Sequence, residues 1–530
     1  MKQVIQNFKT GDLEVKDVPQ PALGEGMVLV SNRFSLISSG TERGTVKVGK
    51  ASLLGKARQR PDLVAQVISN IKKEGLKSTF QKVKTKLDTY KALGYSSCGE
   101  VIASMDTNNR FKPGERVTCA GQDYASHAEV VAVPQNLVAK IPDGVSFEEA
   151  TFTTVGSIAL QGVRLADPKL GENIAVIGLG LIGQITCQLL RANGCRVFGI
   201  DINESSVKMA AEIAADVALN RNAPTLESEG NAFTEGWGFD KVIIAASAPS
   251  NDPIILATEL ARKKGKIILV GDVKMDIPRE PHFFKKELQL LISSSYGPGR
   301  YDTEYEELGK DYPYAYVRWT EQRNMEAFLQ LIASKKINLK PLISKIYEVD
   351  KATEAFDEIL NGNNGASSGI LISYPDATTE TEYQQSGTNM LRVGFIGAGS
   401  FAQSKLIPNF RDRAEFDSVV TSKGSTAQSV ADKFGFKNSL TDAEPLFSEE
   451  GPEVIVVASR HDTHADYVVK SLSAGKAVFV EKPLCLKQSE LEEISEKYGD
   501  IANEKLFVGF NRRFSKSAEY LKSVLPKNTP

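Results

Sequence analysis

Short apolar runs alternate with helix-like stretches over residues 173–295, and the runs KVIIA at 241–245 and KIILVG at 266–271 are the clearest strands. Such alternation is typical of a parallel, doubly wound sheet with helices on its faces. The first 155 residues are instead rich in strand and turn patterns, and we expect a helical insertion at 46–90 to interrupt them. The pattern predicts an α/β protein in which a strand-rich domain precedes a nucleotide-binding type of sheet.

Two glycine-rich turns follow similar strands and open helix-like stretches. GLGLIG at 178–183 follows Ile174–Ile177, and GAGSFA at 397–402 follows Val393–Ile396. In this context the small residues permit the tight turn, the close approach of the backbone to a pyrophosphate and the packing of helix on strand. We therefore predict two nicotinamide cofactor sites. The predicted cofactor contacts in the turns are Gly178, Gly180, Gly183, Gly397, Gly399 and Ala402.

The residues expected at the adenosine ribose differ between the two turns. Asp201 ends the strand 196–200, at the spacing where a carboxylate accepts both ribose hydroxyls and repels a 2′-phosphate, so the first site should prefer NAD(H). The second site has Ser422 and Lys423 there instead, and we expect it to take NAD(H) or NADP(H). Lys423 is equally compatible with a solvated loop lysine.

Composition and charge exclude several classes of function. The chain has 530 residues, of which 41% are hydrophobic and 25% charged, and its formal net charge is −2. These values are ordinary for globular domains, and no basic stripe indicates nucleic acid or an anionic membrane as a partner. Without an apolar leader or membrane-length run, we expect a cytoplasmic protein. The five cysteines form no C-x-x-C pair, so we expect neither a disulfide framework nor a zinc knuckle.

The order of segments up to Tyr374 resembles the medium-chain dehydrogenase/reductase family. FKPGERV at 111–117 and GLGLIG followed by Asp201 carry the resemblance, and the stretch SLISSGTER at 35–43 is similar to a branch that includes bacteriochlorophyllide-type dehydrogenases. The resemblance implies a partly open β-barrel-like (GroES-like) catalytic domain, a Rossmann domain, and a return to the catalytic domain.

Many members of that family hold a catalytic zinc, but the corresponding positions here carry hydroxyl groups. The expected Cys position lies in SSGTE at 38–42, the expected His position in Gly94-Tyr95-Ser96, and the expected third ligand at Thr153-Thr154. Neutral hydroxyls are poor zinc ligands beside imidazole and thiolate, so we predict no metal. Another group must then stabilise an alkoxide during hydride transfer. Tyr95, Ser38 and Thr41 are the candidates, although ordinary hydroxyl packing explains them about as well.

His127 could act as an acid or base in the same cleft, but a structural strand residue is the more common outcome for such a position.

From Leu391 onward the chain resembles the N-terminal part of the Gfo/Idh/MocA oxidoreductase family. The matching segments include GAGSFA, the Thr463-His464 pair, the strand ending in Glu481-Lys482-Pro483, and VGFNRRF at 508–514. The resemblance implies that Lys482 contacts substrate and nicotinamide and that His464 and Glu481 lie at the cofactor. A surface lysine at a strand end is the competing interpretation of Lys482.

The two resemblances predict a layout for the whole chain. The large substrate domain of the second family is expected after residue 510, and only about twenty residues follow there, so we expect the second module to be incomplete. The expected parts are a catalytic domain at 1–155, a first Rossmann domain at 156–294, a return to the catalytic domain at 295–374, a polar linker at 375–389, a second Rossmann domain at 390–510 and a stub at 511–530.

The function expected from these features is hydride transfer between a nicotinamide cofactor and a secondary alcohol or ketone, with a sugar or nucleotide-sugar as one possible substrate. Two alternatives remain open at this stage, a zinc-free reductase of enones and a dinucleotide-binding sensor or scaffold without turnover. We expect a small-molecule substrate, and we expect the chain to form homo-oligomers because both families commonly associate through sheet edges.

Overall fold

The computed structural model describes residues 1–50, 61–75, 79–80, 83, 88–361, 368–375, 390–411 and 413–524. The expected linker at 375–389 lies outside the described residues except for Pro375, and the expected helical insertion at 46–90 is described only in part. Within the described residues, no helix is both long enough and apolar enough to cross a membrane.

The first region is built on two sheets of mostly antiparallel strands. A three-stranded sheet contains β2 (Leu13–Asp17), β1 (Lys2–Asn7) and β4 (Tyr90–Ala92). A seven-stranded sheet contains β15 (Ile343–Glu348), β16 (Gly369–Ser373), β3 (Met27–Ile37), β5 (Ser96–Ser104), β6 (Arg116–Ala120) and β8 (Val138–Lys140), and β7 (Val130–Pro134) pairs with β3. The described strands form no closed barrel. Because β15 and β16 join β3, the chain returns to this region after the first nucleotide-binding sheet.

The described part of this region also contains several helices. They are α1 (Ser39–Lys50), α3 (Pro61–Glu74), α5 (Phe147–Ala150), α6 (Thr153–Ala166), α11 (Thr303–Glu306), α12 (Glu321–Ala333) and α13 (Ala352–Asn361). Gly156 on α6 allows the ring of Phe328 on α12 to pack against it, since a Cβ at Gly156 would lie 2.1 Å from that ring.

The first Rossmann sheet has six parallel strands. Their spatial order is β11 (Val217–Asn220), β10 (Arg196–Asp201), β9 (Asn173–Ile177), β12 (Phe239–Ile244), β13 (Ala261–Leu269) and β14 (Gln289–Ile292). The helices between them are α7 (Leu181–Ala192), α8 (Glu204–Ile213), α9 (Leu226–Phe233) and α10 (Asp252–Leu260). This order, 3-2-1-4-5-6 along the chain, places the glycine turn after the central strand β9.

The second Rossmann sheet repeats the same order with different residues. Its strands are β19 (Asn438–Leu440), β18 (Glu415–Val420), β17 (Arg392–Ile396), β20 (Val454–Val457), β21 (Ala477–Glu481) and β22 (Leu506–Gly509). Its helices are α14 (Ile407–Phe410), α15 (Gly424–Phe434), α16 (His464–Ser473) and α17 (Gln488–Lys505), and α18 (Lys516–Val524) follows the last strand. The α/β class with two doubly wound parallel sheets is confirmed.

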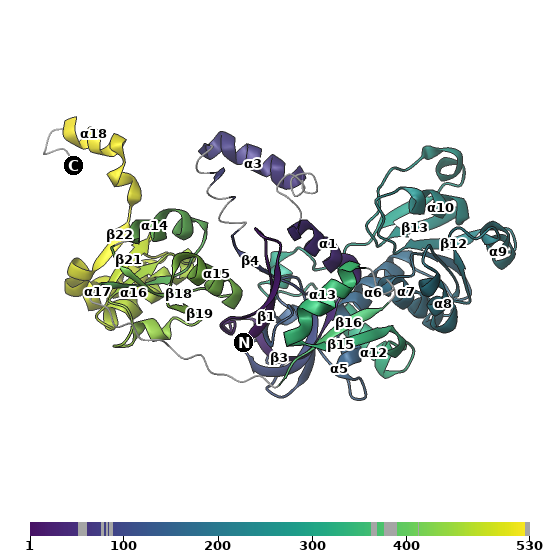
Figure 1. Ribbon diagram of the computed structural model, residues 1–530, viewed down its shortest axis with the longest axis horizontal. Coiled ribbons are helices and arrows are strands. Elements are labelled where there is room, and N and C mark those ends of the chain that lie inside the picture. Colours follow the sequence, from purple (N-terminus) through teal and green to yellow (C-terminus); the bar gives the residue numbers. More distant parts are fainter. Residues whose placement is uncertain are drawn as a thin grey trace.

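The hydrophobic cores divide the chain into two modules. One cluster runs from Val28 in β3 through α6 to Leu190 in α7, so the first region, with its mostly antiparallel sheets, and the first Rossmann sheet share a core. The second Rossmann sheet has clusters of its own, around Val457 and Phe395. Figure 1 shows the two Rossmann sheets at opposite ends of an elongated molecule, with the β1–β2–β4 sheet between them. We call residues 1–375 the first module and residues 390–524 the second.

The two modules contact each other through α15. Lys16 pairs with Asp432 at 2.5 Å, and the Tyr90 hydroxyl donates to the same carboxylate at 2.8 Å. At the start of α15, a Cβ on Gly424 would lie 1.8 Å from the Pro19 carbonyl oxygen. The second module is therefore docked so closely that only a glycine fits at residue 424.

Candidate nucleotide-binding and catalytic sites

The first glycine turn has the geometry of a pyrophosphate cradle. Gly178 has φ of +93°, and a Cβ there would lie 2.5 Å from the Ala246 nitrogen. Gly180 is the N-cap of α7, and a Cβ on Gly183 would lie 1.9 Å from the Gly178 carbonyl oxygen. The turn thus directs the N-terminus of α7, with its unpaired N–H groups, toward the carboxyl end of the sheet, where an anion is stabilised.

Asp201 is held beside this turn by backbone hydrogen bonds. Its Oδ2 accepts from the Leu179 N–H at 2.6 Å, and its Oδ1 accepts from the Asn203 N–H at 2.8 Å. Each oxygen retains a further lone pair, so the carboxylate is oriented and able to accept additional hydroxyl groups.

The positions that would hold zinc in related folds are engaged in other bonds. Thr153 Oγ1 donates to the Ala150 carbonyl at 2.7 Å, and Thr154 Oγ1 donates to the Cys119 carbonyl at 3.5 Å. Burial raises the pKa of Cys119, which disfavours a thiolate. Over the part of the chain that the structure describes, no group of three or more His, Cys, Asp or Glu side chains could hold a metal ion. The two threonine hydroxyls at these positions are committed to backbone carbonyls.

A buried polar network contacts the backbone of Ser38, one of the three predicted catalytic residues. Glu42 Oε1 accepts from the Ser38 N–H at 3.2 Å, and Glu42 Oε2 lies 2.9 Å from His127 Nε2. On its other side, His127 Nδ1 lies 2.7 Å from Ser35 Oγ, which lies 2.6 Å from the Tyr374 hydroxyl. His127 is fully buried with both ring nitrogens engaged, so its place in this structure is that of a structural residue.

The three predicted hydroxyls are described to different extents. Ser38 is almost fully buried at the end of β3, and Tyr95 is half-buried against the main core. The side chain of Thr41 lies outside the described part of the structure. The contribution of each to catalysis stays a prediction.

The second glycine turn is closely packed at its first glycine and open at its second. Gly397 has φ of +90°, and a Cβ there would lie 2.5 Å from the Ala458 carbonyl oxygen. A Cβ at Gly399, by contrast, would meet no atom within 4 Å, and Ala402 is buried under the turn. The space in front of Gly399 is where the close approach of a pyrophosphate is expected.

Lys423 lies at the interface between the modules. Its Nζ is 5.5 Å from the ring centroid of Tyr124 in the first module, while Ser422 is exposed. Tyr124 therefore borders the position expected for the second adenosine ribose, a contact that the sequence alone did not indicate.

The Glu481-Lys482-Pro483 segment ends β21 with its lysine exposed to solvent. Glu481 Oε1 accepts from Asn511 Nδ2 at 3.0 Å. His464 is fully buried, and its Nδ1 donates to the Pro483 carbonyl at 2.7 Å. His464 thus fixes the backbone that carries Lys482, and direct contact of His464 or Glu481 with a cofactor stays a prediction.

Sequence reasoning missed a buried cluster between the glycine-rich loop at 297–299 and the start of α12. Arg300 pairs with Glu306 at 2.5 Å, and Glu321 is fully buried nearby. Burial, reinforced by the charge of Glu306, raises the pKa of Glu321 to about 9. Glu321 is therefore protonated at neutral pH. The sequence feature that could have indicated this cluster is the glycine-rich loop SYGPGR at 295–300, in which Gly299 permits the close approach of Tyr305 and Glu321.

Comparisons with protein families agree with the two nucleotide-binding sheets. Residues 182–310 match the zinc-binding dehydrogenase family, and residues 391–510 match the Gfo/Idh/MocA oxidoreductase family with an NAD-binding Rossmann fold. Both nucleotide-binding regions therefore match families of oxidoreductases.

Individual relatives match the first module. D-arabitol-phosphate dehydrogenase of Enterococcus avium is 25% identical over 305 residues, which are 51% of this chain and 79% of the relative. D-guloside 3-dehydrogenase of Escherichia coli is 27% identical over 270 residues, which are 50% of this chain and 72% of the relative. The crystal structure of galactitol-1-phosphate dehydrogenase from Escherichia coli shares the fold, with a TM-score of 0.54 and 18% identity over 70% of this chain and all of that one.

Proposed function

We propose that this chain is a nicotinamide-dependent oxidoreductase whose first module transfers hydride between NAD(H) and a secondary alcohol or ketone of a polyol or sugar. The main support is the turn of Gly178, Gly180 and Gly183, which lies beside the fixed carboxylate of Asp201. The sheet that carries this turn shares its core with the proposed catalytic region. Relatives named for arabitol phosphate and guloside support the substrate class.

Different residues bind the cofactor and the substrate. The N-terminus of α7 holds the pyrophosphate and Asp201 accepts the ribose hydroxyls, which disfavours a 2′-phosphate. When bound, the nicotinamide supplies the hydride donor or acceptor. Ser38 and Tyr95 orient the substrate oxygen and stabilise the negative charge that develops on it, since hydroxyl donors fixed in a buried site need little reorganisation.

We also propose that this chemistry is independent of zinc. The hydroxyls of Thr153 and Thr154 donate to backbone carbonyls, and the Cys119 thiol is held neutral by burial. Thiolate and imidazole are the ligands that zinc prefers, and these positions supply neither.

The second module is proposed to bind NAD(H) or NADP(H) at Gly397 and Gly399, with Lys482 facing the substrate. The open space at Gly399 and the exposed lysine after β21 support this assignment.

The test is an NADH-absorbance assay of the purified full chain with NAD⁺ or NADP⁺ against sugar alcohols, their phosphates and glycosides. Turnover with NAD⁺ is expected, and Asp201→Ala should raise the KM for NAD⁺ by roughly 10-fold or more, because hydrogen bonds to a charged group contribute about 1.5–3 kcal/mol. Glu204→Gln is the matched control, since this exposed carboxylate lies three residues away and bonds to Asn220.

Metal content and chelator treatment test the zinc proposal on the same preparation. Activity that survives dialysis against a chelator supports it, and activity that is lost and then restored by Zn²⁺ contradicts it. Stoichiometric dinucleotide binding without turnover on any substrate would instead indicate a sensor.

A further inference from the structure

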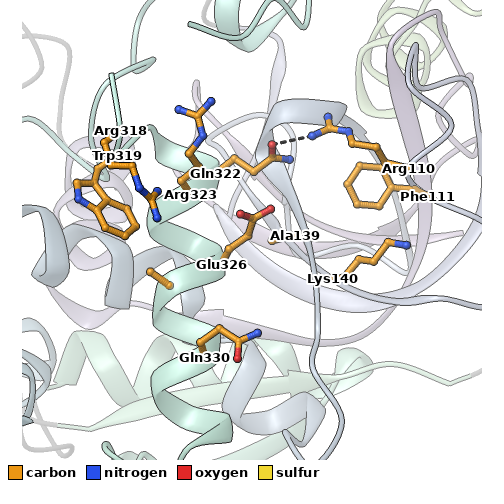
Figure 2. A pocket seen from close by; sticks show the side chains of 11 residues that line it. Arg110, Phe111, Ala139, Lys140, Arg318, Trp319, Gln322, Arg323, Glu326 and Gln330 are labelled. Carbon is orange, nitrogen blue, oxygen red and sulfur yellow. Dashed lines mark hydrogen bonds between the residues drawn. The ribbon is translucent and has the colours of Figure 1, made fainter. Parts of the chain in front are cut away.

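A pocket of about 770 Å³ opens between α12, the loop at Arg110–Phe111 and the end of β8. Figure 2 shows the side chains of α12 facing Arg110, Phe111 and Lys140 across it. The lining includes no residue of either glycine turn or of the Glu481-Lys482-Pro483 segment. Its volume is in the usual range for small-molecule sites of roughly 300–1,000 Å³.

The indole of Trp319 forms one side of this pocket between two arginines. The guanidinium carbon of Arg164 lies 3.3 Å from the ring centroid, and that of Arg318 lies 3.7 Å from it. At such short distances two guanidinium groups cannot share one face, so they lie on opposite faces of the ring. Arg164 is fixed in this position because its Nε donates to Asn324 Oδ1 at 2.7 Å.

Positive charge around the pocket exceeds the negative charge available to pair with it. Lys140 pairs with Glu115, and Arg323 pairs with Asp311. Arg110, Arg164 and Arg318 have no carboxylate within 4 Å among the described residues. Arg110 and Arg318 line the pocket, whereas Arg164 contacts the ring of Trp319 and is not among the lining residues.

Two further observations indicate that this charge is not balanced within the protein. Arg110 donates to Gln322 Oε1 at 2.8 Å and to the Gln135 carbonyl and Asn136 Oδ1 at 3.3 Å each, but its Nε is buried without a hydrogen-bond partner in the structure. Burial and the neighbouring charge of Arg318 lower the pKa of Arg164 to about 10. Glu326 is the one carboxylate among the lining residues, and it cannot neutralise all of these cations.

We propose that this pocket binds the phosphate group of a small phosphorylated molecule, whose organic part lies against Trp319 and Phe111. Arginine forks match the oxygens of a phosphate in pairs, and Arg110 and Arg318 line the pocket without a carboxylate partner among the described residues. The volume of the pocket exceeds that of a single anion, and the ring edges of Trp319 and Phe111, which both line it, offer a surface for the rest of such a molecule. The site is separate from the proposed dinucleotide sites and does not rest on the proposed function.

Trp319 provides a direct readout of occupancy. The chain has two tryptophans, so Trp237→Phe, which removes an indole that is 79% exposed, leaves Trp319 as the sole tryptophan emitter. In this background we would titrate the full chain with inorganic phosphate and with glucose 6-phosphate, using NaCl at matched ionic strength as the reference. A saturable change with both phosphates, and tighter binding of glucose 6-phosphate, are expected.

Arg318→Gln should weaken phosphate binding roughly 10-fold or more, because one charge-assisted hydrogen bond contributes about 1.5–3 kcal/mol. Arg318 is exposed, so the variant should fold normally. Arg191→Gln, on the surface of α7, is the control and should bind as the parent does. A response no larger than that to NaCl, or equal affinity of Arg318→Gln and its parent, would overturn the proposal. Equal affinity for the two phosphates would overturn the role of Trp319 and Phe111 in holding an organic part.

Discussion

Glu321 makes the stability of the first module depend on pH. Its pKa of about 9 in the folded protein lies far above the usual value of 4.5, so between these values the folded state binds a proton that the unfolded state has released. Stability therefore falls as pH rises from about 5 to 9, by at most ~1.4 kcal/mol per pH unit. Below pH 5, the contribution of Glu321 to the free energy of unfolding is fully present.

Glu321→Gln should remove this slope, because the amide does not titrate and has nearly the same shape. Chemical denaturation of the parent and the variant at pH 5, 7 and 9 measures how the free energy of unfolding of each depends on pH. The variant should gain stability relative to the parent as pH rises, and parallel curves at all three values would contradict the protonated state of Glu321.

Gly183 in the first turn and Gly399 in the second should differ in how much stability the protein loses when a methyl group is added. Gly183→Ala places a Cβ 1.9 Å from the Gly178 carbonyl oxygen, so we expect a loss of at least about 1–3 kcal/mol of stability. Gly399→Ala meets nothing within 4 Å, so its stability should change by less than about 0.5 kcal/mol. Its methyl group would nevertheless fill space intended for the pyrophosphate, and nucleotide affinity at the second site should fall. Thermal unfolding and calorimetric titration separate the two effects, and unchanged affinity in Gly399→Ala would count against that site.

At the level of elements, β14 is the edge strand of the first Rossmann sheet among the strands that the structure describes. It is the last of six strands, and Ile292 at its end is 62% exposed. Exposed apolar edges favour pairing with a second copy of the chain. If homo-oligomers form here, Ile292→Lys should shift the protein toward monomer in light scattering after size exclusion, and Ile346→Lys, on the separate strand β15, is the control. An oligomer that is insensitive to Ile292→Lys would place the contact elsewhere.

Local patterns predicted the elements better than they predicted the contacts between them. The strands before both glycine turns and the position of Asp201 follow from hydrophobic runs and spacing within about thirty residues, which is the range over which such patterns carry information. The bonds from His127 to Glu42 and Ser35 join residues 85 and 92 positions apart, and no periodicity encodes them. Arg110 and Trp319, which line the same pocket, are also far apart in the sequence. These sites depend on how sheets and helices pack, which one sequence does not reveal.

For the molecule as a whole, the contact through α15 determines how the modules are arranged. Gly424→Val would place a side chain where the Pro19 carbonyl oxygen now lies, 1.8 Å from a Cβ, so the modules should separate. Small-angle scattering should then show a larger radius of gyration, while secondary structure is retained. Gly499→Ala on α17, where a Cβ meets nothing within 4 Å, is the control. An unchanged radius in Gly424→Val would contradict the docked arrangement.

Tyr374 stands almost at the end of the first module, one residue before the segment that leads to the second, and its hydroxyl reaches Ser35. Through His127 and Glu42, that bond continues to the backbone of Ser38. In mechanical terms the end of the first module is anchored beside the candidate active site. A displacement of Tyr374 would act on Ser38 through four side chains, none of which belongs to a nucleotide-binding sheet.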